Sequence, residues 1–139
     1  MKYKKGITIA SIVIYVILLF AFTTLALNVS SNMSNGMFDD KGFAINLSNY
    51  DKAMYYLNKS AIGSNSIAVT ENTLTFSNGN VFEYDSQMQA LYYNQGILLN
   101  DVTGFNIIND DINVYNIQIQ LTSYSNEISR NIKLYIGEW

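Results

Sequence analysis

The sequence predicts an α+β fold in which a long N-terminal transmembrane helix packs on an antiparallel β-meander. Two observations predict it. Residues 7–27 contain no charged side chain, and from Ser66 onward apolar residues alternate with polar ones at a period of two. The first pattern is typical of a membrane-spanning helix, and the second of strands that bury one face. The 139 residues therefore divide into one apolar segment and one small folded domain.

The apolar segment is long enough to cross a bilayer. Ile7–Leu27 contains 21 residues, and at about 1.5 Å of rise per residue a helix of that length is roughly 31 Å long. Three lysines precede it and favour a cytoplasmic N-terminus, with the rest of the chain outside. A cleaved secretory signal usually has an apolar core of only about 7–15 residues before a small-residue site such as Thr24-Leu25-Ala26. A single-pass anchor is favoured, and a secretory signal is the alternative.

Residues 28–65 are predicted to extend this helix and then to form a loop and a short second helix. Asn28–Asn32 contains modest helix formers, so we expect the helix to loosen there. Asp39–Gly42 should end it. An apolar stripe at helical spacing, expected to pack against the sheet, consists of Met33, Met37 and Phe38.

The second helix is predicted from a new start signal. Ser48–Asp51 matches an N-cap box, and the helix should end near Ser60, before a loop at Gly63-Ser64. The side chains expected on its apolar face are Tyr50, Met54 and Leu57.

Residues 66–139 are predicted to form an antiparallel sheet of six or seven strands. Turn residues separate the strands at Asn78-Gly79, Asn94-Gln95-Gly96 and Asn109-Asp110-Asp111. A strand is expected at Val102–Ile108. Arg130 occupies a position in the last strand that alternation assigns to the buried, apolar face. We therefore expect it at the end of the strand, where the pairing is loose. One face of the meander would be buried, and the extracellular half of the N-terminal helix is the expected cover.

Composition narrows the function. The chain has no cysteine and no histidine, which excludes disulfides, thiol nucleophiles and imidazole bases. No pair of acidic residues stands out either, so we expect no enzyme, cofactor or metal site. After Gly6 there are five basic and eleven acidic residues, a net charge of −6. Because the basic residues are scattered, direct nucleic-acid binding is not expected.

The start of the apolar segment is more specific than a plain anchor requires. Lys4-Lys5-Gly6-Ile7-Thr8-Ile9 resembles the processing site of type IV prepilins and type II secretion pseudopilins, in which a short basic leader ends in Gly before a hydrophobic helix. The resemblance implies a leader of residues 1–6, cleavage between Gly6 and Ile7 by a prepilin peptidase, and methylation of the Ile7 amine. A plain anchor is the alternative.

A second resemblance lies in the predicted sheet. The order and spacing of turns and strands from Ser66 to Phe105 resemble those of J-type pseudopilins and of the competence minor pilins of Firmicutes. The stretches that carry it are Phe76–Asn80, Tyr84-Asp85, Tyr92–Leu99 and Asp101-Val102.

Ser11 departs from the family pattern. It is the fifth residue of the processed chain, where most members have a Glu that pairs with the amine of a neighbouring subunit. A buried carboxylate is costly unless it is paired, so a subunit at the tip of the filament has no use for one. Ser11 is therefore compatible with a place in the tip or initiating complex. It is equally compatible with a lineage that assembles without the pair.

The expected function is structural. The resemblance implies a minor pilin or pseudopilin in a type IV pilus, a competence pilus or a type II secretion pseudopilus. Its partners would be other pilin subunits, the prepilin peptidase, the inner-membrane assembly platform and, before assembly, membrane lipid. The alternative is a single-pass anchored extracellular binding module. Secretion, DNA uptake, adhesion and motility remain open.

Overall fold

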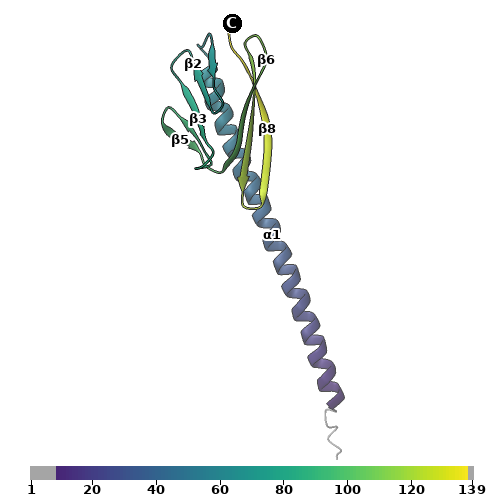
Figure 1. Ribbon diagram of the computed structural model, residues 1–139. Coiled ribbons are helices and arrows are strands. Elements are labelled where there is room, and N and C mark those ends of the chain that lie inside the picture. Colours follow the sequence, from purple (N-terminus) through teal and green to yellow (C-terminus); the bar gives the residue numbers. More distant parts are fainter. Residues whose placement is uncertain (1–8, 138–139) are drawn as a thin grey trace, which may run out of the picture. The chain divides into compact units, whose positions relative to one another are not determined.

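The computed structural model describes residues 9–137 and contains one helix and eight strands (Figure 1). The chain divides into an N-terminal unit, Met1–Phe38, and a C-terminal unit, Asp39–Trp139. The elements are α1 (Ile9–Ala61), β1 (Ile67–Val69), β2 (Thr73–Phe76), β3 (Val81–Asp85), β4 (Ala90–Tyr93), β5 (Gly96–Leu99), β6 (Val102–Asp111), β7 (Val114–Ser123) and β8 (Asn126–Tyr135). A long apolar N-terminal helix followed by antiparallel strands confirms the α+β class.

A single helix replaces the two that the sequence predicts. α1 is helical through Asn28–Asn32, through Asp39–Gly42 and through Ser48–Asp51, so the predicted loosening, loop and second N-cap are wrong. Each modest helix former costs at most about 0.7 kcal/mol relative to Ala. In the C-terminal unit, packing of one helix face against the strands outweighs such costs.

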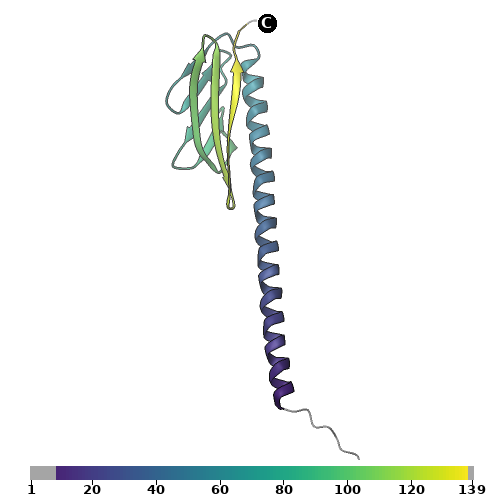
Figure 2. The same ribbon diagram turned by 90° about the vertical axis from the view of Figure 1, so that its right-hand side faces the viewer.

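That packed face has a regular helical spacing. Its buried residues are Gly42, Asn46, Tyr50, Ala53, Leu57 and Ser60. The predicted apolar face is therefore partly wrong, because Met54 is 38% exposed whereas Ala53 is fully buried. Both views show this part of α1 alongside the strands (Figures 1 and 2).

The strands form two antiparallel sheets where the sequence predicts one meander. The five-stranded sheet has the order β1-β2-β3-β4-β5, and the three-stranded sheet the order β6-β7-β8. The hairpin predicted at Asn78-Gly79 is confirmed as β2–β3, and the hairpin at Asn94–Gly96 as β4–β5. The chain leaves the first sheet at Asp101, whose φ of 60° turns the backbone before β6 begins.

The turn between β6 and β7 also differs from the prediction. β6 continues through Asn109–Asp111, and the loop consists of Ile112-Asn113. Asn113 has a φ of 61°, which Asn tolerates better than most residues, and the Ile112 N–H donates to the Asp111 carboxylate at 2.7 Å. β6 stays paired with β7 as far as Asp111 and Val114, so the strand reaches further than its composition indicates.

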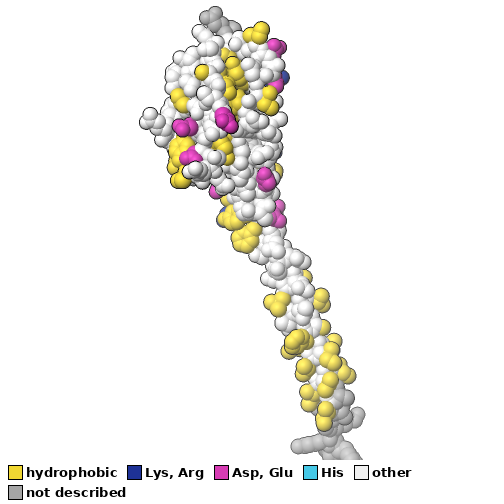
Figure 3. Space-filling view, viewed as in Figure 1, with side chains coloured by type: hydrophobic (Ala, Val, Ile, Leu, Met, Phe, Trp, Pro, Cys, Tyr) yellow, Lys and Arg dark blue, Asp and Glu magenta, His cyan; other side chains and the backbone are white. Residues whose placement is uncertain are grey.

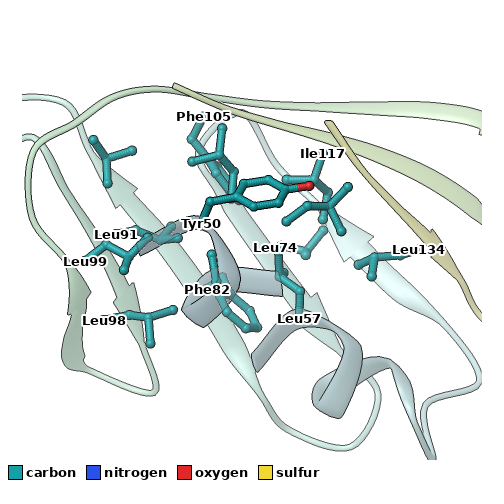
Figure 4. Close-up of a cluster of buried hydrophobic side chains, with 14 of the residues drawn as sticks. Tyr50, Leu57, Leu74, Phe82, Leu91, Leu98, Leu99, Phe105, Ile117 and Leu134 are labelled. Atoms are coloured by element: carbon teal, nitrogen blue, oxygen red, sulfur yellow. The ribbon is translucent and has the colours of Figure 1, made fainter. Parts of the chain in front are cut away.

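The core of the C-terminal unit lies between α1 and the two sheets. The Tyr50 ring extends toward Ile117 of the second sheet, and Leu57 lies beside Leu74 of the first (Figure 4). Phe82 and Leu91 of the first sheet belong to the same buried cluster. The second sheet contributes Val102, Phe105, Ile117, Ile119, Leu121, Ile132 and Leu134. The sequence predicts a cover by the extracellular half of a helix that ends at Asp39–Gly42, and this is wrong in its residues. The part of α1 that covers the core runs from Gly42 to Ser60, and it contacts both sheets.

Candidate functional site

The most distinctive surface of the N-terminal unit is the apolar part of α1. An 18-residue stretch of the helix has a mean hydropathy of 2.5, and none of it is buried. By length and composition this is a helix that could cross a membrane, as the sequence predicts. Its exposed side chains include Ile12, Ile14, Leu18, Phe20, Phe22 and Leu25 (Figure 3).

The two threonine hydroxyls of this segment bond within the helix. Thr23 Oγ1 donates to the Leu19 carbonyl at 2.7 Å, and Thr24 Oγ1 donates to the Phe20 carbonyl at 2.8 Å. Polar groups in hydrocarbon need partners within the protein, and these bonds supply them one turn back along the helix. The segment can therefore exchange water for an apolar environment without leaving these hydroxyls unpaired.

A shallow groove follows one face of the same segment. Its lining residues are Phe22, Leu25, Ala26, Val29, Ser30, Met33, Ser34 and Met37. They recur every three or four positions, so they describe a helix face rather than an enclosed cavity. The stripe of Met33, Met37 and Phe38 was predicted to pack against the sheet, and that prediction is wrong because Met33 and Met37 are 66% and 72% exposed.

The residues singled out for processing and assembly lie at the start of the chain. Gly6 and Ile7 are outside the described residues. Ser11 lies in the first turns of α1 and is partly buried. The predicted cleavage, methylation and assembly roles of these positions stay predictions.

Close contacts hold α1 against the β7–β8 turn at the beginning of the C-terminal unit. Ser125 donates a short hydrogen bond to the Asp39 carboxylate, and Asn46 Nδ2 donates to the Asn126 carbonyl at 2.9 Å. A Cβ on Gly42 would lie 2.5 Å from the Ser123 carbonyl oxygen. Sequence reasoning missed this contact because Gly42, after two acidic residues, has the pattern of a helix end.

Most basic side chains of the C-terminal unit lie over tyrosine rings. The pairs, with their distances from the charged group to the ring centroid, are Lys41–Tyr124 (5.7 Å), Lys59–Tyr55 (5.9 Å), Arg130–Tyr50 (5.4 Å) and Lys133–Tyr135 (5.9 Å). Lys52 instead donates to the Leu98 carbonyl at 2.8 Å. Each of the five cations of this unit therefore has a partner within the unit.

Arg130 corrects a detail of the sequence prediction. It is paired with Ile119 inside β8 rather than placed at a frayed strand end. The Tyr50 hydroxyl donates to the Asn131 carbonyl at 3.1 Å, beside the same guanidinium. Burial raises the pKa of Tyr50, although the Arg130 charge partly offsets this. The Arg–Tyr pair therefore covers the core of this unit and leaves the hydroxyl protonated at neutral pH.

Among residues 9–137 there is no group of three His, Cys, Asp or Glu side chains that could hold a metal ion. No protein-family model, no curated protein and no solved structure matches the chain.

Proposed function

We propose that this chain is a minor pilin or pseudopilin, a structural subunit of a type IV pilus, a competence pilus or a type II secretion pseudopilus. One observation carries the proposal. An uncharged apolar helix that buries none of its hydrophobic window continues, as the same helix, into the spine of an antiparallel domain. The leader motif ending at Gly6 adds support from the sequence.

The helix has two successive roles in this proposal. It first anchors the subunit in the cell membrane, with the N-terminus in the cytoplasm and the sheets outside. The assembly platform then moves the subunit from lipid into the filament, where apolar faces of other pilin subunits replace the lipid. Because both environments are apolar, the transfer requires no exposure of the helix to water.

The proposal assigns no catalytic role to the domain. The chain contributes shape, an assembly helix and an external surface, whereas cleavage and methylation at Gly6 and Ile7 are performed by the prepilin peptidase. An anchored extracellular binding module would have the same helix and domain. It would differ in keeping its leader and in staying in the bilayer.

The N-terminus of the mature protein separates these possibilities. We expect N-terminal sequencing and intact mass of the membrane-extracted protein to give a chain that begins with a methylated Ile7. Gly6→Val should block cleavage while leaving the protein in the membrane fraction, because a branched Cβ next to the scissile bond does not fit where Gly does. Thr8→Ser, two residues past the bond, is the matched control and should be processed normally.

Two results would contradict the proposal. An intact leader in the wild type indicates a permanent anchor, and a start near Leu27 indicates a secretory signal. Either result would leave the helix and the sheets as described but remove the pilin assignment.

A further inference from the structure

The outer face of the five-stranded sheet has a concave site that neither α1 nor the core uses. Its volume is about 350 Å³, and its lining residues are Gly79, Val81, Glu83, Tyr92, Asn94 and Gln95. Glu83 and Tyr92 are paired across β3 and β4, and they alternate with the core residues Phe82 and Leu91. They therefore point away from the core, toward the solvent-facing side of the sheet.

The two hairpin turns form one rim of this site. Phe82 pairs with Tyr93, so the β2–β3 turn and the β4–β5 turn lie at the same end of the sheet. The Asn80 Oδ1 atom accepts hydrogen bonds from the Tyr93 hydroxyl at 2.9 Å and from Asn94 Nδ2 at 3.0 Å. Asn94 Oδ1 in turn accepts from the Val81 N–H at 2.8 Å. These bonds join the turns, so the rim is held in place before any ligand arrives.

The second turn is also strained. Asn94 and Gln95 have φ values of 49° and 71°, a left-handed conformation in which Asn is tolerated but Gln is unfavourable. Tight hairpin turns of this kind usually place Gly at the second position. Here Gln95 occupies it, and its exposed amide stands at the edge of the concavity. Strain of this type, retained where Gly would relieve it, is commonly found at binding sites.

We propose that this site binds a neutral pyranose sugar. The partly exposed Tyr92 ring, which lines the concavity, offers a flat apolar surface for the C–H face of a sugar ring. The Glu83 carboxylate accepts hydrogen bonds from hydroxyl groups, and the Gln95 amide can both donate and accept. No Lys or Arg lines the site, and a carboxylate does, which disfavours a phosphate or another anion.

The occupant that competes with a sugar is a cationic side chain of another protein. A ring next to a carboxylate suits such a cation, and four of the five cations of this unit do lie over tyrosines. The amide at the rim and a volume large enough for a six-membered ring favour the sugar. The cation is therefore an outcome of the test.

The test measures sugar binding to the full chain in micelles of a detergent that has no sugar headgroup. The probes are methyl β-glucopyranoside, methyl β-galactopyranoside and N-acetylglucosamine, followed by saturation-transfer NMR and titration. A lysine tripeptide is the cationic probe. We expect at least one sugar to bind, with an affinity that does not change with salt, because the ligand is neutral.

Three substitutions locate the site. Tyr92→Ala should weaken sugar binding by about tenfold or more, since it removes the stacking surface. Glu83→Gln and Gln95→Gly should each weaken it by roughly threefold to tenfold while leaving the fold intact, because both side chains are exposed. Tyr55→Ala, at an exposed tyrosine of α1 outside the concavity, is the matched control and should bind as the wild type does.

Three results would overturn the proposal. One is the absence of binding by all three sugars to the wild type. Another is unchanged sugar affinity in the Tyr92 and Glu83 variants. The third is salt-sensitive binding of the lysine peptide, lost in those same two variants without any sugar binding, which would assign the site to a cation. All three are independent of how the N-terminus is processed, so a failure here is distinguishable from a failure of the pilin proposal.

Discussion

The two parts of α1 have the same secondary structure and opposite surfaces. From Ile9 to Phe38 the large apolar side chains described are about half exposed or more, and there is no charged residue. From Asp39 to Ala61 a regular face is buried against the sheets, and the rest of the helix includes six charged residues, Asp39, Asp40, Lys41, Asp51, Lys52 and Lys59. The second part obtains its apolar environment from its own chain. An apolar helix surface of this length is unfavourable in water, and in the proposed function lipid and then other subunits supply the apolar environment of the first part.

Truncation of a leucine in each part should give the largest contrast. Leu57 is fully buried, so Leu57→Ala should lower the free energy of unfolding of the C-terminal unit by about 2–5 kcal/mol. Leu25→Ala, at a side chain that is 64% exposed, should leave that free energy unchanged. Denaturant unfolding of the full chain in micelles, monitored by the strand signal in circular dichroism, measures both. Equal effects of the two variants would refute the contrast.

A carboxylate introduced at Ser11, in the exposed part of α1, tests whether another subunit lies above this one in the filament. If the subunit lies at the filament tip, Ser11→Glu buries a carboxylate with no amine above it. That should cost several kcal/mol unless the group is protonated, and it should lower filament assembly. Filaments per cell are counted at matched protein levels, with Ser11→Ala as the control. An unchanged or higher count would remove the tip position while leaving the family proposal intact.

The two glycines of α1 should respond in opposite directions. Gly42→Ala places a Cβ 2.5 Å from the Ser123 carbonyl oxygen, so it should destabilise the C-terminal unit by about 1–3 kcal/mol. Gly36 has nothing within 4 Å of the position a Cβ would take. Gly36→Ala should therefore raise the helix content and stabilise the helix by about 1 kcal/mol.

Circular dichroism at 222 nm reports on the helix, and thermal unfolding of the strand signal reports on the domain. A stable, well-folded Gly42→Ala variant would mean that the helix and the β7–β8 turn separate easily in solution. That result would weaken the distinction between a self-packed part and an unpacked part of α1.

The sequence by itself determined the features that depend on local pattern. An uncharged run of this length can be recognised without knowledge of the fold, because the length of a bilayer-spanning helix depends only on the rise per residue. The hairpin at Asn78-Gly79 follows from Gly79, which accepts a positive φ. The hairpin at Asn94–Gly96 was found from the same residue types, although its positive φ values fall on Asn94 and Gln95 rather than on Gly96. The alternation of apolar and polar residues identified the strands and most of the core. The processing motif proposed at Gly6 is likewise a local pattern.

Tertiary contacts decided the remaining features. Asp39–Gly42 has the composition of a helix end, but the helix continues because Gly42 permits a close approach to the β7–β8 turn and Ser125 bonds to Asp39. Ser123 and Ser125 lie more than 80 residues further along the chain, so a reading of the local sequence around Asp39–Gly42 cannot include them. The division into two sheets depends on how the strands close around Tyr50 and Leu57. The concave site arises because the turns of two different hairpins are brought to the same end of one sheet. Local propensities are worth a few tenths of a kcal/mol per residue, whereas burial of a single core side chain contributes about 1.5–3 kcal/mol, so long-range packing prevails wherever the two conflict.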